Sequence, residues 1–227
     1  MGIHVSTLIL GASCYGCGIA LRRPDSLILE PTIQPGAEFT LTGCPAGNLA
    51  FEPESAAGRS FLQELRRRSV ICDGMLHNAA LAPVLANWCL DHRLHILFKA
   101  LPVRQEESRV TVMQADGLRE YSADEIIDAR PKITTPHLCT FLAKAVPGVF
   151  GDFVIFRTLM KDLFVMRQRL FPGCGYASAR KRLREFWEDR PASLRQAALL
   201  WSATRFCNDT IDNPVFELER GIRRGEE

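Results

Sequence analysis

The first thirty residues constrain the fold most, because apolar runs alternate there with a glycine turn in a fixed order. Residues 5–10 form a short aliphatic and β-branched run typical of a buried strand. A glycine-rich segment and a short helix over residues 14–23 follow, and Pro24 and Asp25 end that helix. Residues 26–29 are a second apolar run, which Glu30 closes. The order strand, glycine turn, helix, strand, acid predicts a βαβ unit.

The glycine turn has the spacing of a dinucleotide-binding motif, with Gly11, Ser13 and Gly16 in the positions of G-x-G-x-x-G. Small residues let backbone N–H groups and the helix dipole approach a pyrophosphate, since a larger side chain would hold the ligand away. The Ser13 hydroxyl is small and can donate to a phosphate oxygen. A glycine turn that binds no nucleotide is the alternative.

Glu30 stands where a carboxylate accepts hydrogen bonds from ribose hydroxyls. The same carboxylate repels a 2′-phosphate, which counts against NADP as the ligand. We therefore expect Gly11, Ser13, Gly16 and Glu30 to bind a dinucleotide.

Composition narrows the partners of the chain. Over 227 residues, 28 Lys and Arg balance 26 Asp and Glu, so the charge shows no sign of nucleic-acid or membrane-surface binding. No window is long and apolar enough for a membrane span, and the start lacks the basic and apolar regions of a secretory signal. Eight cysteines are too dilute for a disulfide scaffold. We expect a cytoplasmic protein with a small-molecule substrate, which binds neither nucleic acid nor membrane.

The rest of the chain predicts an α/β protein. Residues 31–58 are expected to form a long loop, and an Asp116-Gly117 turn to join a hairpin. Beyond Pro131, apolar residues at helical spacing predict mainly helices. Residues 1–130 would form a Rossmann-like FAD/NAD(P)-binding domain, and residues 131–227 a mainly helical C-terminal region completing or capping it. The expected helices are 60–68, 79–92, 153–170, 178–188 and 193–206; the expected strands are 95–98, 109–114, 118–122 and 126–129; residues 220–227 are expected to fray.

Three segments resemble the FAD-dependent oxidoreductases that begin with a Rossmann-like domain. They are residues 8–30, the loop 34–39 (Gln-Pro-Gly-Ala-Glu-Phe), and residues 77–129, in which a helix, a strand, a hairpin and a return strand follow in that family's order. The resemblance covers about residues 3–130. It implies FAD as the cofactor, with NAD as the alternative, and hydride or electron transfer between the flavin and a small molecule.

The chain departs from that family at two places. The return strand continues as Asp128-Ala129-Arg130-Pro131, where the family has Asp-Ala-Thr-Gly, and the separate substrate domain is missing or shrunken. Gly151-Asp152 is the candidate for the late Gly-Asp pair that holds the ribityl and phosphate end of FAD; a helix N-cap is its alternative. A non-catalytic or partner-dependent relative and an NAD-dependent dehydrogenase therefore remain open. The hairpin and the loop after Glu30 count against the dehydrogenase.

Three residues are candidates for catalysis. Cys14 and Cys17 have the spacing of a redox dithiol at a helix start, a location that lowers thiol pKa; the alternative is that both are small residues filling a tight turn. His77 begins the helix that approaches the flavin in the resembled family, where it could act as acid or base or simply as a structural residue.

Two further patterns concern metals and partners. The cysteines show no metal-ligand spacing, so no metal site is predicted. The expected C-terminal helices are basic, which indicates either solvated faces or a docking surface for an acidic protein partner. Their basic residues are Arg180, Lys181, Arg182 and Arg184, with Arg190 and Arg195 further along.

Overall fold

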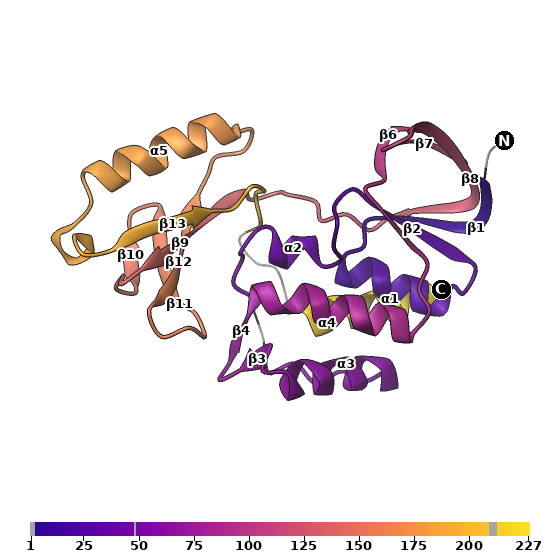
Figure 1. Cartoon of the computed structure of the whole chain (residues 1–227), viewed down its shortest axis with the longest axis horizontal. Helices are drawn as coiled ribbons and strands as arrows, with labels where there is room; N and C mark the ends of the chain where they lie inside the picture. Colours follow the sequence, from indigo (N-terminus) through magenta and orange to yellow (C-terminus); the bar gives the residue numbers. More distant parts are fainter. Residues whose placement is uncertain (1–2, 48, 209–212) are drawn as a thin grey trace.

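The computed structural model describes residues 3–47, 49–208 and 213–227, and builds them around two sheets (Figure 1). The first sheet has six strands in the order β5-β2-β1-β8-β7-β6, and the second has five in the order β10-β11-β12-β9-β13. Helices α1, α3, α4 and α6 gather at the first sheet, and α5 lies on the second. The mixed α/β class predicted from the sequence is confirmed.

The N-terminal βαβ unit is confirmed. Strand β1 (Ile3–Leu10) pairs in parallel with β2 (Ser26–Glu30), and α1 (Cys14–Arg22) connects them. Strand β5 (Ile96–Phe98) extends the sheet beside β2. This is the expected order of elements, and it leaves the glycine turn at the carboxyl ends of the parallel strands, where α/β sheets bind ligands.

The two strands predicted over 118–122 and 126–129 are one long strand, β8 (Gly117–Asp128). It pairs antiparallel with β7 (Arg109–Gln114) and parallel with β1, so it joins the hairpin to the parallel sheet. The Asp-Gly turn is confirmed, with Gly117 at a φ of 118°. The remaining elements of this part are α2 (Ala37–Thr40), α3 (Ala56–Arg67), β3 (Ile71–Cys72), β4 (Met75–Leu76), α4 (Asn78–Asp91) and β6 (Leu101–Gln105).

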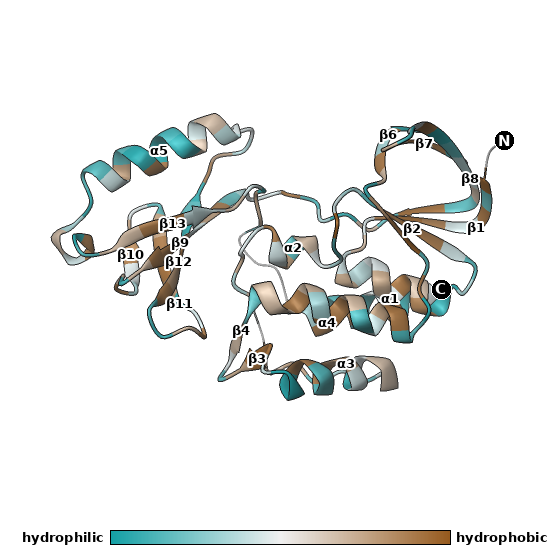
Figure 2. Cartoon of the chain, in the orientation of Figure 1, coloured by the Kyte–Doolittle hydropathy of each residue, from teal (hydrophilic) through white to brown (hydrophobic). Residues whose placement is uncertain are grey.

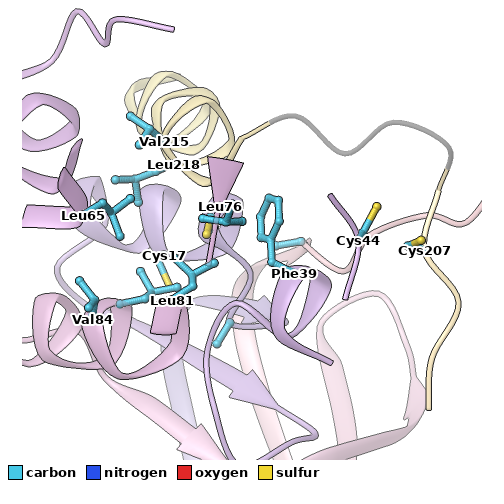
Figure 3. Close-up of a cluster of buried hydrophobic side chains, with 14 of the residues drawn as sticks. Cys17, Phe39, Cys44, Leu65, Leu76, Leu81, Val84, Cys207, Val215 and Leu218 are labelled. Carbon is cyan, nitrogen blue, oxygen red and sulfur yellow. The ribbon is translucent and has the colours of Figure 1, made fainter. Parts of the chain in front are cut away.

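The two faces of the six-stranded sheet bury different side chains, as the period of two along a strand requires. Ile9, Ile28 and Ile127 belong to the core that contains the helices. Leu8 and Leu29 lie in a separate core with the valines of β7. The apolar strands of this sheet are visible as brown segments in Figure 2, and Figure 3 shows side chains of α1, α3, α4 and α6 meeting in the helical core.

The mainly helical C-terminal region was a wrong prediction. Residues 153–170 form a β-hairpin, and residues 193–206 contain a short 3-10 helix and a strand. Phe153 and Ile155 are buried while Val154 between them is half-buried, so alternation prevailed over the helical spacing read from the sequence. The second sheet comprises β9 (His137–Ala143), β10 (Gly148–Phe150), β11 (Phe153–Arg157), β12 (Leu163–Arg169) and β13 (Ala198–Ser202); α5 (Tyr176–Glu188) is helical as expected.

The C-terminal segment also differs from its expected frayed state. It forms α6 (Pro214–Glu226), whose N-cap Asn213 accepts from the amides of Val215 and Phe216 at 2.8 Å. Helix α6 lies directly against α1: a Cβ on Gly221 would come within 2.0 Å of the Tyr15 carbonyl oxygen. Glycines at this contact let the two backbones touch, so the chain end holds the helix of the βαβ unit.

We expect Gly221→Ser to lower the free energy of unfolding by about 2–3 kcal/mol, because the new side chain overpacks the contact between α1 and α6. Gly175→Ser is the matched control, since a Cβ on Gly175 meets no atom within 4 Å and serine suits the N-cap of α5. Urea denaturation measures both. Equal stability of the two variants would contradict the close packing.

Candidate functional site

The turn between β1 and α1 accepts only small residues. Gly11 has a φ of 102°, and a Cβ on it would lie 3.0 Å from Cγ of Arg130. A Cβ on Gly16 would lie 2.3 Å from the Gly11 carbonyl oxygen. Two of the three predicted motif positions therefore require glycine for reasons of backbone conformation and close approach.

Ser13 has a different role from the one expected. Its hydroxyl accepts from the Gly16 amide at 3.0 Å, which makes it the N-cap of α1, and donates to the Ala129 carbonyl at 2.8 Å. The proton expected to reach a phosphate oxygen is thus given to the end of β8. Ser13 ties α1 to the return strand.

Glu30 faces the turn, as predicted. Its carboxylate is 4% exposed and accepts from the amides of Ala12 and Thr32, both at 2.8 Å. Because the Ala12 amide belongs to the turn itself, the acid at the end of β2 lies directly beside the N-terminus of α1.

A second buried acid, Glu38, lies at the same helix end. Its Oε1 accepts from the amide of Cys14, the first residue of α1, at 2.7 Å. Burial raises the pKa of Glu38 from 4.5 to about 7, although the hydrogen bond from Cys14 opposes the shift. The sequence placed Glu38 only within a family-like loop; Gly36, at a φ of 69°, turns that loop back onto the helix and donates its amide to the Ala12 carbonyl at 2.8 Å.

Two adjoining cavities of about 450 and 490 Å³ border the turn, and Ser13, Glu38, Arg130 and Pro131 line both. The cavity of 450 Å³ extends from Gly11 and Glu30 to the residues after β13, such as Arg205 and Phe206. The cavity of 490 Å³ extends toward Glu217 and Arg220 of α6. Basic side chains also line their walls, and two of them form ion pairs there, Arg130 with Asp128 and Arg220 with Glu217. We call these two cavities together the crevice; its basic residues are Arg130, Lys132, Arg205 and Arg220, and its aromatic residues are Tyr15, Tyr176 and Phe206.

The departure from the family pattern at the end of β8 places an arginine in the crevice. The Arg130 guanidinium pairs with Asp128 at 2.7 Å and holds the pKa of that carboxyl below its ordinary value. The missing glycine is thus replaced by an ion pair beside Gly11.

The structure does not support a redox dithiol at Cys14 and Cys17. Both thiols are fully buried, and the expected lowering of their pKa is wrong in direction. Burial and the charge of Glu38 raise the pKa of Cys14, while the Cys89 thiol and burial raise that of Cys17. Cys17 lies next to Cys89, with 3.7 Å between the sulfur atoms.

Two other candidates have structural roles. His77 is the N-cap of α4, and its Nδ1 accepts from the Ala80 amide at 3.3 Å. Gly151-Asp152 forms the turn of the β10–β11 hairpin, so Asp152 caps no helix. It pairs instead with Arg182 of α5 at 2.6 Å, and both residues lie away from the crevice lining. Docking of an acidic partner on α5 stays a prediction.

No protein-family model matches the sequence, and no curated protein matches it. Solved structures do match: p-nitrophenol 4-monooxygenase PnpA from Pseudomonas putida has a TM-score of 0.57 at 13% identity, covering 100% of this chain and 78% of its own. A flavoprotein/dehydrogenase from Cytophaga hutchinsonii has a TM-score of 0.55 at 12% identity, covering 98% and 77%. The chain has the flavoprotein fold.

A third match widens the range of reactions found on this fold. A geranylgeranyl bacteriochlorophyll reductase-like protein from Thermoplasma acidophilum has a TM-score of 0.58 at 9% identity, covering 100% of this chain and 78% of its own. Proteins named as a monooxygenase, a dehydrogenase and a reductase-like protein thus share this architecture. Among the helices of the described residues, none is long and apolar enough to cross a membrane.

Because the folded-state pKa of Glu38 is raised, its contribution to stability is fully present below pH 4.5 and is lost as the pH rises through about 7. Over that range the loss is about 3 kcal/mol. Glu38→Gln keeps an acceptor for the Cys14 amide without the charge, so we expect it to unfold at a higher temperature than the parent at pH 8 and to differ little at pH 4.5. Thermal denaturation at both values measures this, with the exposed Glu52→Gln as the control. A parent-like melting temperature of Glu38→Gln at pH 8 would contradict the assigned pKa.

Proposed function

We propose that this chain binds FAD in the crevice and works as an oxidoreductase on a small molecule. The observation that carries the proposal is Glu30, a buried carboxylate held against a small-residue turn at the carboxyl ends of parallel strands. The flavoprotein fold supports it, as do monooxygenase and dehydrogenase names among the structural matches.

The residues of the crevice fit the adenosine and diphosphate parts of the cofactor. Because Gly11 has no side chain, a diphosphate could approach the backbone N–H groups of the turn and of the N-terminus of α1. Lys132 would supply positive charge beside it, and Arg130 and Arg220 would do so in exchange for Asp128 and Glu217, with which they pair; Glu30 would accept from the adenosine ribose. When bound, FAD supplies the hydride or electron transfer, so the chain's own task is to hold and orient it.

Glu38 makes this binding depend on protonation. Its carboxyl occupies the Cys14 amide at the helix end toward which a diphosphate would turn. The ionised form repels such a ligand and the neutral form does not. Because the pKa of Glu38 is about 7, a neutral carboxyl is accessible near physiological pH. Binding of the diphosphate would then take up a proton at Glu38.

We expect the Kd for FAD to rise about tenfold per pH unit above pH 7, since each binding event takes up one proton. Glu38→Gln should bind FAD with little dependence on pH. Titration of flavin fluorescence between pH 6 and 9 measures both, and Glu52→Gln is the control. The same pH slope in Glu38→Gln and in the parent would remove Glu38 from the site.

Gly11→Val should abolish FAD binding, because its side chain would enter the turn and collide with Arg130. Gly117→Val is the matched control: Gly117 also has a positive φ, so the backbone strain is similar, yet a Cβ there meets no atom within 4 Å and the residue lies outside the crevice. Circular dichroism checks folding, and flavin absorbance after reconstitution measures occupancy. Equal occupancy in the two variants would overturn the assignment of the turn.

The absorption spectrum and calorimetry separate the open alternatives. Flavin bands in the purified or reconstituted protein support the proposal. A colourless protein that binds NAD and no FAD would be a dehydrogenase on the same unit, and one that binds neither would be a non-catalytic relative.

A further inference from the structure

Three cysteines far apart in the sequence meet between the two sheets. Cys44 follows α2, Cys139 lies on β9, and Cys207 lies on the segment from β13 to α6. Their sulfur atoms all lie within 4.8 Å of one another, and those of Cys139 and Cys207 are 3.6 Å apart. All three residues are fully buried. Figure 3 shows Cys44 and Cys207 on neighbouring segments at the edge of the core.

We propose that Cys44, Cys139 and Cys207 bind a zinc ion. Zinc holds thiolates at about 2.3 Å, and two thiolates on a tetrahedral ion are therefore about 3.8 Å apart. The observed separations need shifts of only a few tenths of an ångström to about one ångström to reach this geometry. Three thiolates together are a typical soft-metal donor set.

His137 is the nearest candidate along β9 for the fourth ligand, although its ring nitrogens lie outside the group of ligand atoms within 4.8 Å of one another, so the imidazole would have to move toward the three sulfur atoms. His137 pairs with Cys207 across an antiparallel bridge, with backbone hydrogen bonds of 2.8 and 3.0 Å, so the two side chains leave the same face of the sheet. Cys139 is two residues further along β9 and shares that face. Nδ1 of His137 must donate to the Thr135 carbonyl, 2.9 Å away, so a bond from His137 to the metal would have to come from Nε2.

The surroundings also suit a thiolate site. Arg167 lies opposite Cys139 on β12, and paired residues of neighbouring strands share a face. The positive charge of Arg167 would offset the net negative charge of zinc with three thiolates.

A disulfide between Cys139 and Cys207 is the competing use of these residues. It would employ two of the three sulfur atoms and leave the buried Cys44 thiol without a function. The chain already has a simple thiol pair in Cys17 and Cys89, whose sulfur atoms are 3.7 Å apart. The presence of a third buried sulfur atom, that of Cys44, therefore favours a metal site over a disulfide.

The test begins with the parent chain of 227 residues, reduced and reconstituted with zinc. We expect about one zinc ion per chain, and X-ray absorption at the zinc edge should show three sulfur neighbours at about 2.3 Å and one nitrogen. Less than a tenth of an equivalent of zinc, or a coordination shell of nitrogen and oxygen, would overturn the proposal. This measurement needs no variant and so does not depend on the folding of one.

Variants then assign the ligands. Cys44→Ser, Cys139→Ser and Cys207→Ser should each lose at least nine-tenths of the zinc, whereas Cys174→Ser, a buried cysteine outside the cluster, should retain it. Zinc retained equally by all four variants would overturn the assignment. A disulfide would also overturn it. In that case a thiol titration of the metal-free protein, prepared without reductant, would find two thiols fewer than expected, and the protein would bind no zinc after reduction. Binding of Cu⁺ but not of Zn²⁺ would overturn the choice of zinc.

Discussion

The N-terminus of α1 is the point on which the rest of the structure depends. Unpaired amides at a helix start need acceptors, and here the sequence provides three from separate segments. Ser13 caps the helix and ties it to Ala129, Glu30 accepts from Ala12, and Glu38 accepts from Cys14. These bonds join β1, β2, the loop containing α2 and the end of β8 at one place, while α6 fixes the outer side of the helix. The fold and the proposed binding of FAD therefore depend on the same few backbone groups.

The two acids at that helix end have different consequences. Glu30 serves two backbone amides, so its charge is distributed over the turn that it faces. Glu38 is buried with the amide of Cys14, its own amide and the nearby negative charge of Glu217, and burial raises its pKa to about 7, so that a large fraction of its carboxyl is neutral at physiological pH. A helix N-terminus attracts negative charge, yet desolvation opposes a second carboxylate in the same cavity. An incoming diphosphate would replace that carboxylate charge rather than add to it.

Local patterns predicted the local parts of the structure. The βαβ unit, the turn glycines and the orientation of Glu30 follow from contiguous residues, as do α4 and the Asp116-Gly117 turn. The strands of 153–169 were missed because their apolar residues satisfy a helical and an alternating pattern alike, and only pairing with β9 decides between them. The roles of Glu38 and of the cysteine cluster were not predicted, because these residues are far from their partners in the sequence and become neighbours only in the folded chain.

The connections between the sheets unite these features. Residues 129–136 run from β8 of the first sheet to β9 of the second, and residues 203–208 follow β13 of the second sheet. These two segments supply Arg130, Arg205 and Phe206 to the crevice, and a backbone bridge between His137 and Cys207 joins them next to Cys44 and Cys139. Neither connection has regular structure of its own, apart from the single bridge between His137 and Cys207. The positions of the crevice side chains on these segments therefore depend on the contacts that hold the segments in place. A metal ion at Cys44, Cys139 and Cys207 would anchor both connections to the loop that carries Glu38, and would thereby hold opposite walls of the crevice at a fixed separation.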